Sequence, residues 1–170
     1  MRNAFVASGI VALAALSTAC GPTTSEPAPA PAADSAPAAP PAPKLTDAEK
    51  ATILATLPAP YNAGDLAAGK STFALCQSCH TITQGGPNKT GPNLYGVFGR
   101  VAGTHEGFNY SDAVKAAGFT WDAEKLDAWL ANPKTFLPGN RMTFVGLKDA
   151  EKRRDLIAYL KVETGYKPGE

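Results

Sequence analysis

Two thiols and an imidazole stand together in the middle of this sequence, in the order Cys76-Gln77-Ser78-Cys79-His80. Thiols three residues apart lie on one helical turn, so both can add to the two vinyl groups on one side of a porphyrin. The histidine that follows is then carried beneath the iron, where its imidazole becomes an axial ligand. The C-x-x-C-H pattern is therefore typical of covalent haem attachment, which bacteria carry out outside the cytoplasm.

Two other uses of these residues remain open. A thioredoxin-like dithiol shares the C-x-x-C spacing, but it needs a βαβ context, and no strand is expected before Cys76. A zinc site could recruit His80 and His105, although adjacent Cys79 and His80 would struggle to face one metal ion. A non-haem module with a Cys/His metal site is thus the alternative to a haem protein.

The small number of Cys, His and Met residues excludes several kinds of site. The chain has 170 residues with three Cys, two His and two Met, and only Cys76, Cys79, His80, His105 and Met142 fall in the expected folded part. Two cysteines cannot build a zinc site of three or four thiolates or a disulfide scaffold. A formal net charge of +1, with 18% charged residues, argues against nucleic-acid binding.

The elements that must position these residues are helices. Apolar spacing and capping residues predict helices over 45–57, 65–76, 122–131 and 149–163, separated by Gly/Pro/Asn-rich loops at 84–93 and 99–109 with no convincing strand. Residues 61–170 are expected to form one all-α domain whose thin core needs a large apolar group. The first helix begins with a Thr46/Glu49 capping box and belongs to a linker over residues 44–60. It either packs on the domain or stiffens the tether, the segment that precedes it.

The N-terminus reads as an export signal over residues 1–19. Arg2 precedes an uncharged apolar run that is short for a membrane span. Leu16 to Cys20 resembles a bacterial lipoprotein box, which predicts a lipidated Cys20 as the mature N-terminus. Cleavage after Ala19 by an ordinary signal peptidase, or an uncleaved anchor, are the alternatives.

Residues 20–43 are expected to be a tether. Sixteen of the 22 residues in 22–43 are Pro or Ala, a composition that favours an extended polyproline-like form and cannot bury a core. At about 3.1 Å per residue, this segment reaches at most roughly 70 Å. Such a composition is typical of a spacer that separates a membrane anchor from a folded domain.

Beyond the C-x-x-C-H motif, the sequence resembles the class I cytochromes c, in particular the mitochondrial and bacterial c2-like branch. The resemblance covers nearly all of 64–165. Its blocks are Gly64-Asp65, Gly69, Phe73, Cys76 to His80, Thr90-Gly91-Pro92-Asn93-Leu94, Gly96 to Arg100, Gly107 to Ser111, Trp121, Asn132-Pro133-Lys134, Leu137 to Met142, Phe144-Val145-Gly146 and Asp155 to Leu160. So many blocks in order make the resemblance specific.

The resemblance implies a fold and a set of roles. The fold would be the all-α cytochrome c fold, with three to five short helices and long loops around one covalent haem. Met142 would be the second iron ligand, and the Pro92 carbonyl would accept the N–H of His80. Four side chains would contact the haem propionates: Arg100, Tyr110, Trp121 and Asn140.

The chain also departs from the branch in ways that bear on its redox potential. Trp129 stands where a Tyr beside the Met sulfur is usual, and Val114 replaces a common buried Asn. The lysine ring is thin, and residues 61–170 hold 13 basic and 11 acidic side chains, so electrostatic steering should be weak. His105 is expected to be an exposed loop residue rather than an alternative iron ligand.

By resemblance, the protein would be a monomeric one-electron carrier and not an enzyme. Its donor would be a cytochrome bc1-type complex and its acceptor a terminal cytochrome oxidase. It would sit on the periplasmic side of a bacterial membrane, held by lipidated Cys20, or else be soluble in the periplasm. The alternative function is a haem peroxidase or small-ligand sensor in which Met142 is labile.

Overall fold

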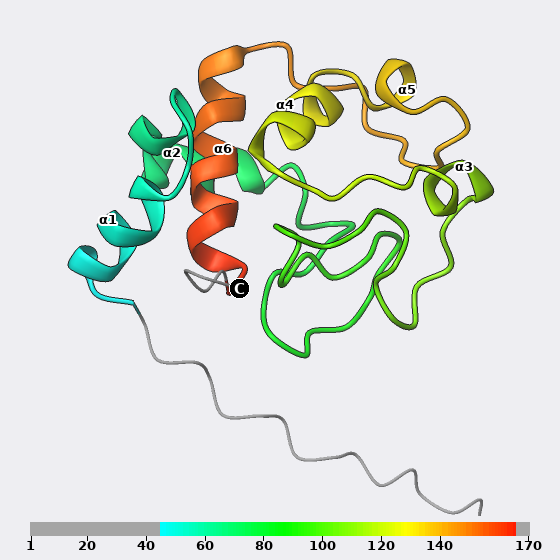
Figure 1. Ribbon diagram of the computed structural model, residues 1–170, viewed down its shortest axis with the longest axis horizontal. Coiled ribbons are helices and arrows are strands. Elements are labelled where there is room, and N and C mark those ends of the chain that lie inside the picture. The colour runs from blue at the N-terminus through cyan, green and yellow to red at the C-terminus, as the bar shows by residue number, and fades with distance from the viewer. Residues whose placement is uncertain (1–44, 166–170) are drawn as a thin grey trace, which may run out of the picture. The chain divides into compact units, whose positions relative to one another are not determined.

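The computed structural model describes residues 45–165, and the predictions for the signal, Cys20 and the tether lie outside these residues. The described part has six α-helices and one 3₁₀ helix, η1 (Figure 1). Their bounds are α1 Asp47–Ala55, η1 Tyr61–Ala63, α2 Leu66–Phe73, α3 Asp112–Lys115, α4 Ala123–Ala131, α5 Pro133–Phe136 and α6 Ala150–Glu163. Within residues 45–165 the strand-like pairing is an isolated bridge between Val101 and Thr120, so the all-α prediction is confirmed.

Side-chain caps begin each of the four predicted helices. Thr46 and Glu49 make the expected reciprocal capping box at α1. Asp65, Asp122 and Asp149 accept backbone N–H groups at the starts of α2, α4 and α6. Each bond satisfies donors that a helix leaves free in its first turn.

Two helices of four residues each, α3 and α5, were not predicted. The Asn132-Pro133 pair lies directly after the helix predicted over 122–131. It also starts α5, because Asn132 accepts the Thr135 N–H at 3.3 Å and Pro133 takes the first helical position. Proline is favoured at that position, since its missing N–H would have no helical partner there.

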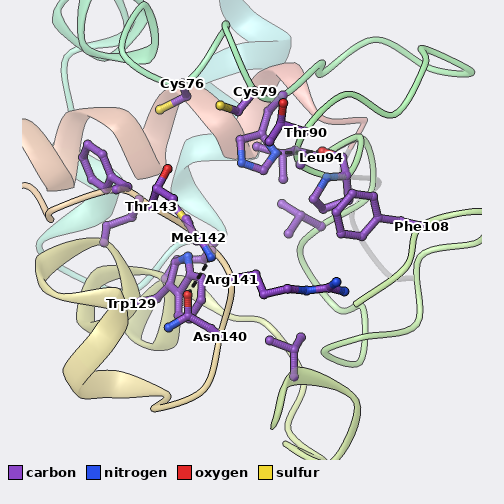
Figure 2. A pocket seen from close by; sticks show the side chains of 18 of the residues that line it. Cys76, Cys79, Thr90, Leu94, Phe108, Trp129, Asn140, Arg141, Met142 and Thr143 are labelled. Atoms are coloured by element: carbon purple, nitrogen blue, oxygen red, sulfur yellow. Dashed lines mark hydrogen bonds between the residues drawn. The ribbon is translucent and has the colours of Figure 1, made fainter. Parts of the chain in front are cut away.

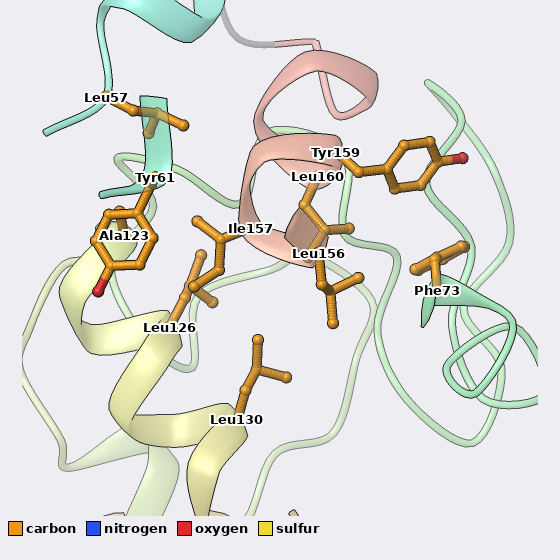
Figure 3. Close-up of a cluster of buried hydrophobic side chains, with 10 residues drawn as sticks. All are labelled: Leu57, Tyr61, Phe73, Ala123, Leu126, Leu130, Leu156, Ile157, Tyr159 and Leu160. Atoms are coloured by element: carbon orange, nitrogen blue, oxygen red, sulfur yellow. The ribbon is translucent and has the colours of Figure 1, made fainter. Parts of the chain in front are cut away.

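The C-terminal helix α6 is the centre of the core. Figure 1 shows α6 with α1 and α2 to one side and α4 to the other. Leu156, Ile157 and Ala158 in α6 are at most 1% exposed. Figure 3 shows the apolar cluster that surrounds α6, which is made of Leu57, Tyr61, Phe73, Ala123, Leu126, Leu130, Leu156, Ile157, Tyr159 and Leu160.

The crossing of α2 over α6 depends on Gly69. A Cβ at this position would lie 2.6 Å from the Tyr159 Cβ and would overlap the Asp155 carbonyl oxygen. One turn further on, the Phe73 and Tyr159 rings lie 5.7 Å apart. The predicted contact of Gly69 and Phe73 with the last helix is therefore confirmed.

We expect Gly69→Ala to lower the free energy of unfolding by about 3 kcal/mol, because α2 and α6 must separate to admit the methyl group. Helix propensity alone predicts the opposite sign, a gain of about 1 kcal/mol. Urea unfolding of the haem-loaded protein measures the difference. The control Ala68→Gly lies on the exposed side of α2 and should cost only about 1 kcal/mol.

Helix α1 packs on the domain and does more than stiffen the chain before it. Ile53 in α1 is 6% exposed and Leu57, just after the helix, is 5% exposed. Leu57 belongs to the cluster around α6, and Leu54 packs against that cluster. Of the two roles left open for this helix, the structure supports packing.

Leu57→Ala should therefore destabilise the domain by about 2–4 kcal/mol, the usual cost of deleting a buried leucine. Thermal unfolding of the full chain checks this value. Thr52→Ala, at an exposed position of α1, serves as the control and should change stability little. Equal stability of the two variants would mean that the α1 region does not pack on the domain.

Candidate functional site

A cavity of about 780 Å³ brings the predicted residues together (Figure 2). Cys76, Cys79 and His80 line it from the turns that follow α2, and Met142 lines it from the loop between α5 and α6. Its apolar floor is shared with the core, because Phe73, Leu126, Leu130, Leu156 and Leu160 belong to both. Pro92, Arg100, Tyr110, Trp121, Trp129 and Asn140, all predicted from sequence, also line it.

The His80 imidazole is oriented by its own chain. Its Nδ1 donates to the Pro92 carbonyl oxygen at 2.8 Å, as predicted, which leaves Nε2 free to bind a metal. A side chain at Gly91 would collide with the imidazole ring, so glycine is required beside it. Burial lowers the pKa of His80, which favours the neutral, ligating form of the ring.

Cys76 and Cys79 form no disulfide and line the same cavity. Burial raises the pKa of Cys76 to about 11, with a smaller contribution from Cys79. Figure 2 shows the sulfur atoms of Cys76 and Cys79 at one end of the cavity, with Trp129 and Asn140 at the other. This placement suits two thioether bonds to one side of a flat group.

Met142 is held by Asn140. The Met142 backbone N–H donates to Asn140 Oδ1 at 2.9 Å, and Asn140 Nδ2 donates to the carbonyl oxygens of Pro133 and Leu137 at 2.9 and 2.7 Å. Both N–H groups of the amide are thus used by the chain. The propionate contact predicted for Asn140 would require one of these bonds to be exchanged, and it stays a prediction.

We therefore expect Asn140→Ala to loosen Met142 rather than only to alter a propionate contact. Three hydrogen bonds within the loop are lost, each worth about 1 kcal/mol. The loss should appear as weaker ligation of the iron by Met142, visible as easier displacement by added imidazole. Thr143→Ala, exposed in the same loop, should leave this displacement unchanged.

A polar corner of the cavity gathers Arg100, Tyr110, Ser111 and Trp121. Arg100 Nη1 donates to the Asn93 carbonyl oxygen at 3.1 Å, and Nη2 donates to the Tyr95 carbonyl oxygen. Burial lowers the pKa of Arg100, and the nearby Tyr110 hydroxyl partly offsets this effect. Burial raises the pKa of Tyr110, so its hydroxyl stays protonated and able to donate. Two cavity-facing donors at one corner favour an anionic group such as a carboxylate.

Ser111 is a site residue for which the sequence reasoning assigned no role. Its Oγ is buried and has no hydrogen-bond partner within the described residues. A buried hydroxyl rarely goes unpaired, so one facing this cavity indicates a polar atom of the bound group. Its place directly after Tyr110, at the polar corner, was the available signal. The cavity, its ligand side chains and this unpaired hydroxyl together fit a haem with its propionates near Arg100.

Comparison with known proteins agrees with this fit. A family model described as Cytochrome c matches residues 66–162. A cytochrome c of Chlamydomonas reinhardtii is 54% identical over 103 residues, which are 60% of this chain and 92% of that protein. A cytochrome c2 of Blastochloris viridis is 49% identical over 109 residues, covering 64% of this chain and 86% of that protein. The chain belongs to the cytochrome c family.

A solved structure agrees with the family assignment. Cytochrome cH from Methylobacterium extorquens is 47% identical, with a TM-score of 0.55, and the match covers 58% of this chain and 98% of that one. The fold is therefore the cytochrome c fold, and the cofactor is one covalently attached haem c. As a member of this family, the chain is an electron carrier.

The departures from the branch lie in the cavity wall. The Trp129 ring lies 5.5 Å from Trp121 and 6.0 Å from Phe136, in edge-to-face contacts. Val114 is 9% exposed and presents an apolar surface to the cavity. Both residues line the cavity, and a hydrogen bond from the Trp129 indole to the Met142 sulfur stays a prediction.

His105 stays outside the cavity lining. The His105 backbone lies near the Tyr110 hydroxyl, and burial together with the Arg100 charge lowers the pKa of the His105 imidazole. In the described part of the chain, no group of three or more His, Cys, Asp and Glu side chains comes together to hold a metal. The structure therefore gives no support to a Cys/His metal module and none to His105 as an iron ligand.

Proposed function

We propose that this cytochrome c shuttles single electrons from a bc1-type complex to a terminal cytochrome oxidase while tethered to the periplasmic side of a bacterial membrane. The observation that carries the shuttle is the pairing of His80 and Met142 in one cavity, each held by a hydrogen bond from its own chain. When bound, haem c supplies a one-electron couple at its iron. If His80 and Met142 both bind the iron, it would have no position left for a substrate, which disfavours peroxidase or sensor chemistry.

The residues around the cavity would support electron transfer by holding the haem ligands in a fixed arrangement. The bond of His80 to Pro92 and the bond of the Met142 backbone to Asn140 would hold the ligand side chains in place in both oxidation states, so little reorganisation would accompany each electron. The apolar wall formed by Leu126, Leu130 and Leu156 keeps water away from the haem face. A thioether ligand opposite imidazole raises the potential into a range that suits respiratory transfer.

The tether supports the membrane part of the proposal. Lipidation of Cys20 would give a stable anchor, and a Pro/Ala segment of up to roughly 70 Å lets the domain reach neighbouring complexes without leaving the surface. Soluble periplasmic protein and an uncleaved anchor are the alternatives. Among residues 45–165, the structure contains no helix with the length and apolar character of a membrane span.

Fractionation with mass spectrometry of the mature N-terminus tests the anchor. We expect haem in the membrane fraction and the mass of acyl chains on Cys20. The Cys20→Ser variant should shift the haem to the soluble fraction or leave the signal uncleaved. Recovery of the whole wild-type pool as soluble protein cut after Ala19 would overturn the tethered form.

Purified respiratory complexes test the shuttle. The haem-loaded protein should be reduced by a bacterial bc1 complex with a quinol, and the reduced form should be oxidised by an oxidase of the cytochrome c type. Binding of CO to the reduced wild-type protein at neutral pH, without denaturant, would instead favour the sensor or peroxidase function. Inertness toward both complexes would overturn the proposed partners.

A further inference from the structure

The loop that carries Met142 is held at two places. It runs from the end of α5 to the start of α6, and the side-chain bonds of Asn140 fix its first half. Its second half is held by Arg153 of α6, whose Nη1 donates to the carbonyl oxygens of Leu147 and Lys148, both at 2.9 Å. Met142 therefore lies between two anchored parts of one loop.

The Arg153 guanidinium is oriented by Asp127 of α4. Arg153 Nε donates to Asp127 Oδ1 at 2.9 Å, and Nη2 donates to Oδ2 at 3.3 Å. Such a two-pronged pair is stronger and more directional than a single contact. The Arg153 and Asp127 side chains are only 12% and 26% exposed, so water screens them less than a surface pair. We call this pair, with the carbonyl groups of Leu147 and Lys148, the loop clamp.

The segment that contains α1 and η1 packs beside the loop clamp. This segment precedes residues 66–162, the part of the chain that matches the family, and both of its helices contact α6. Its Tyr61 is 8% exposed and belongs to the apolar cluster around α6 (Figure 3). Burial raises the pKa of Tyr61, the Asp127 carboxylate adds to the rise, and the Arg153 charge opposes it. The Tyr61 hydroxyl thus lies within electrostatic reach of both members of the pair.

A buried ring beside an ion pair strengthens the pair. The attraction between opposite charges grows as the effective dielectric constant around them falls. The Tyr61 ring occupies space that water would otherwise fill next to Asp127, so it lowers the screening of the pair. The segment before the family match can therefore act on the Met142 loop without touching the haem cavity, whose lining includes no residue of α1 or η1.

We propose that Asp127 and Arg153 are positioning residues that resist the release of Met142 from the haem iron. Tyr61, in the segment that precedes the family match, strengthens their pairing. Release of Met142 requires its loop to move, and the loop clamp stabilises only the loop in its present position. Loss of the clamp therefore favours any ligand that competes with Met142. The inference rests on the proposed ligation by Met142, and it does not depend on the membrane anchor or the redox partners.

Imidazole is the probe, because it can take the position of Met142 on the oxidised iron. The test measures the apparent dissociation constant of imidazole for the oxidised, haem-loaded full chain, from its absorption spectrum. The test variants are Arg153→Lys, Asp127→Asn and Tyr61→Ala. Two controls accompany them: Lys152→Gln removes an exposed charge next to Arg153 in α6, and Asp65→Ala removes the side-chain cap of α2.

We expect Arg153→Lys to lower the dissociation constant by about fivefold to tenfold, because an amine cannot bond to the carboxylate and to both carbonyl groups at once. Asp127→Asn and Tyr61→Ala should each lower it by about threefold. Because Tyr61 acts through the pair, the double variant Asp127→Asn/Tyr61→Ala should match Asp127→Asn alone. A change of about ninefold, the product of the two single effects, would show independent action and overturn the role of Tyr61.

The controls separate the loop clamp from a general loss of stability. Lys152→Gln and Asp65→Ala should bind imidazole within about twofold of wild type, although Asp65→Ala lowers the temperature of unfolding. Wild-type binding in both Arg153→Lys and Asp127→Asn, or an equal gain in Asp65→Ala, would overturn the inference alone. Met142→Ala should bind imidazole far more tightly than wild type. Equal binding would mean that Met142 is not the iron ligand, which would overturn the proposed function and this inference together.

Discussion

Replacing both Cys76 and Cys79 by alanine is expected to abolish covalent haem and, with it, the folded domain. The cavity shares Phe73, Leu126 and Leu156 with the core cluster, so the haem completes the core instead of resting on it. Without the haem, the apolar side chains that line this cavity of about 780 Å³ would face water, and the core would lose the large apolar group that it packs against.

Intact mass and far-UV circular dichroism measure the two parts of this result. The variant should have the mass of the polypeptide alone and little helix. Ser78→Ala, exposed in the same turn, should keep both the haem and the helices. A double variant that lacks haem and yet keeps a native helical spectrum would show that the walls of the cavity support themselves.

The four helices that the sequence predicted all have local signals, although the unpredicted helix α5 also begins with a local cap at Asn132 and Pro133. Asp65, Asp122 and Asp149 are caps that act within three residues, so a short window of sequence contains all the information. The one-turn helix α3 has no side-chain cap bond, and its buried residue Val114 lines the cavity. The packing of Leu57 on α6 was equally hidden, because it joins residues about a hundred positions apart.

The residues of the site also differ in whether a local sequence signal could predict them. Cys76 and His80 were predicted because covalent attachment fixes their spacing, and Pro92 and Met142 because the resemblance supplied their roles. Asn140 was placed correctly in the cavity, but its bonds to Pro133, Leu137 and Met142 depend on how one loop folds on itself. Residue type alone cannot tell an amide that faces a propionate from one that holds the Met142 loop.

Met142→Ala is expected to keep the haem attached and to open one axial position of its iron. The thioether bonds at Cys76 and Cys79 do not involve Met142, so the mass of the haem-loaded chain should change only by the substitution. The reduced variant should bind CO at neutral pH, which the wild-type protein should not do. Loss of the thioether ligand should lower the potential by on the order of 0.1 V or more, within the roughly 0.8 V that axial ligands span.

The Met142→Ala variant also tests whether Met142 or His105 is the second protein ligand of the iron. Thr143→Ala, exposed in the same loop, should leave the potential and CO binding as in wild type. If Met142→Ala fails to bind CO and keeps a low-spin spectrum, another side chain must reach the iron. His105 is the only other histidine of the chain, so the double variant Met142→Ala/His105→Ala would identify it. Because His105 does not line the cavity, we expect the single variant already to show an open position.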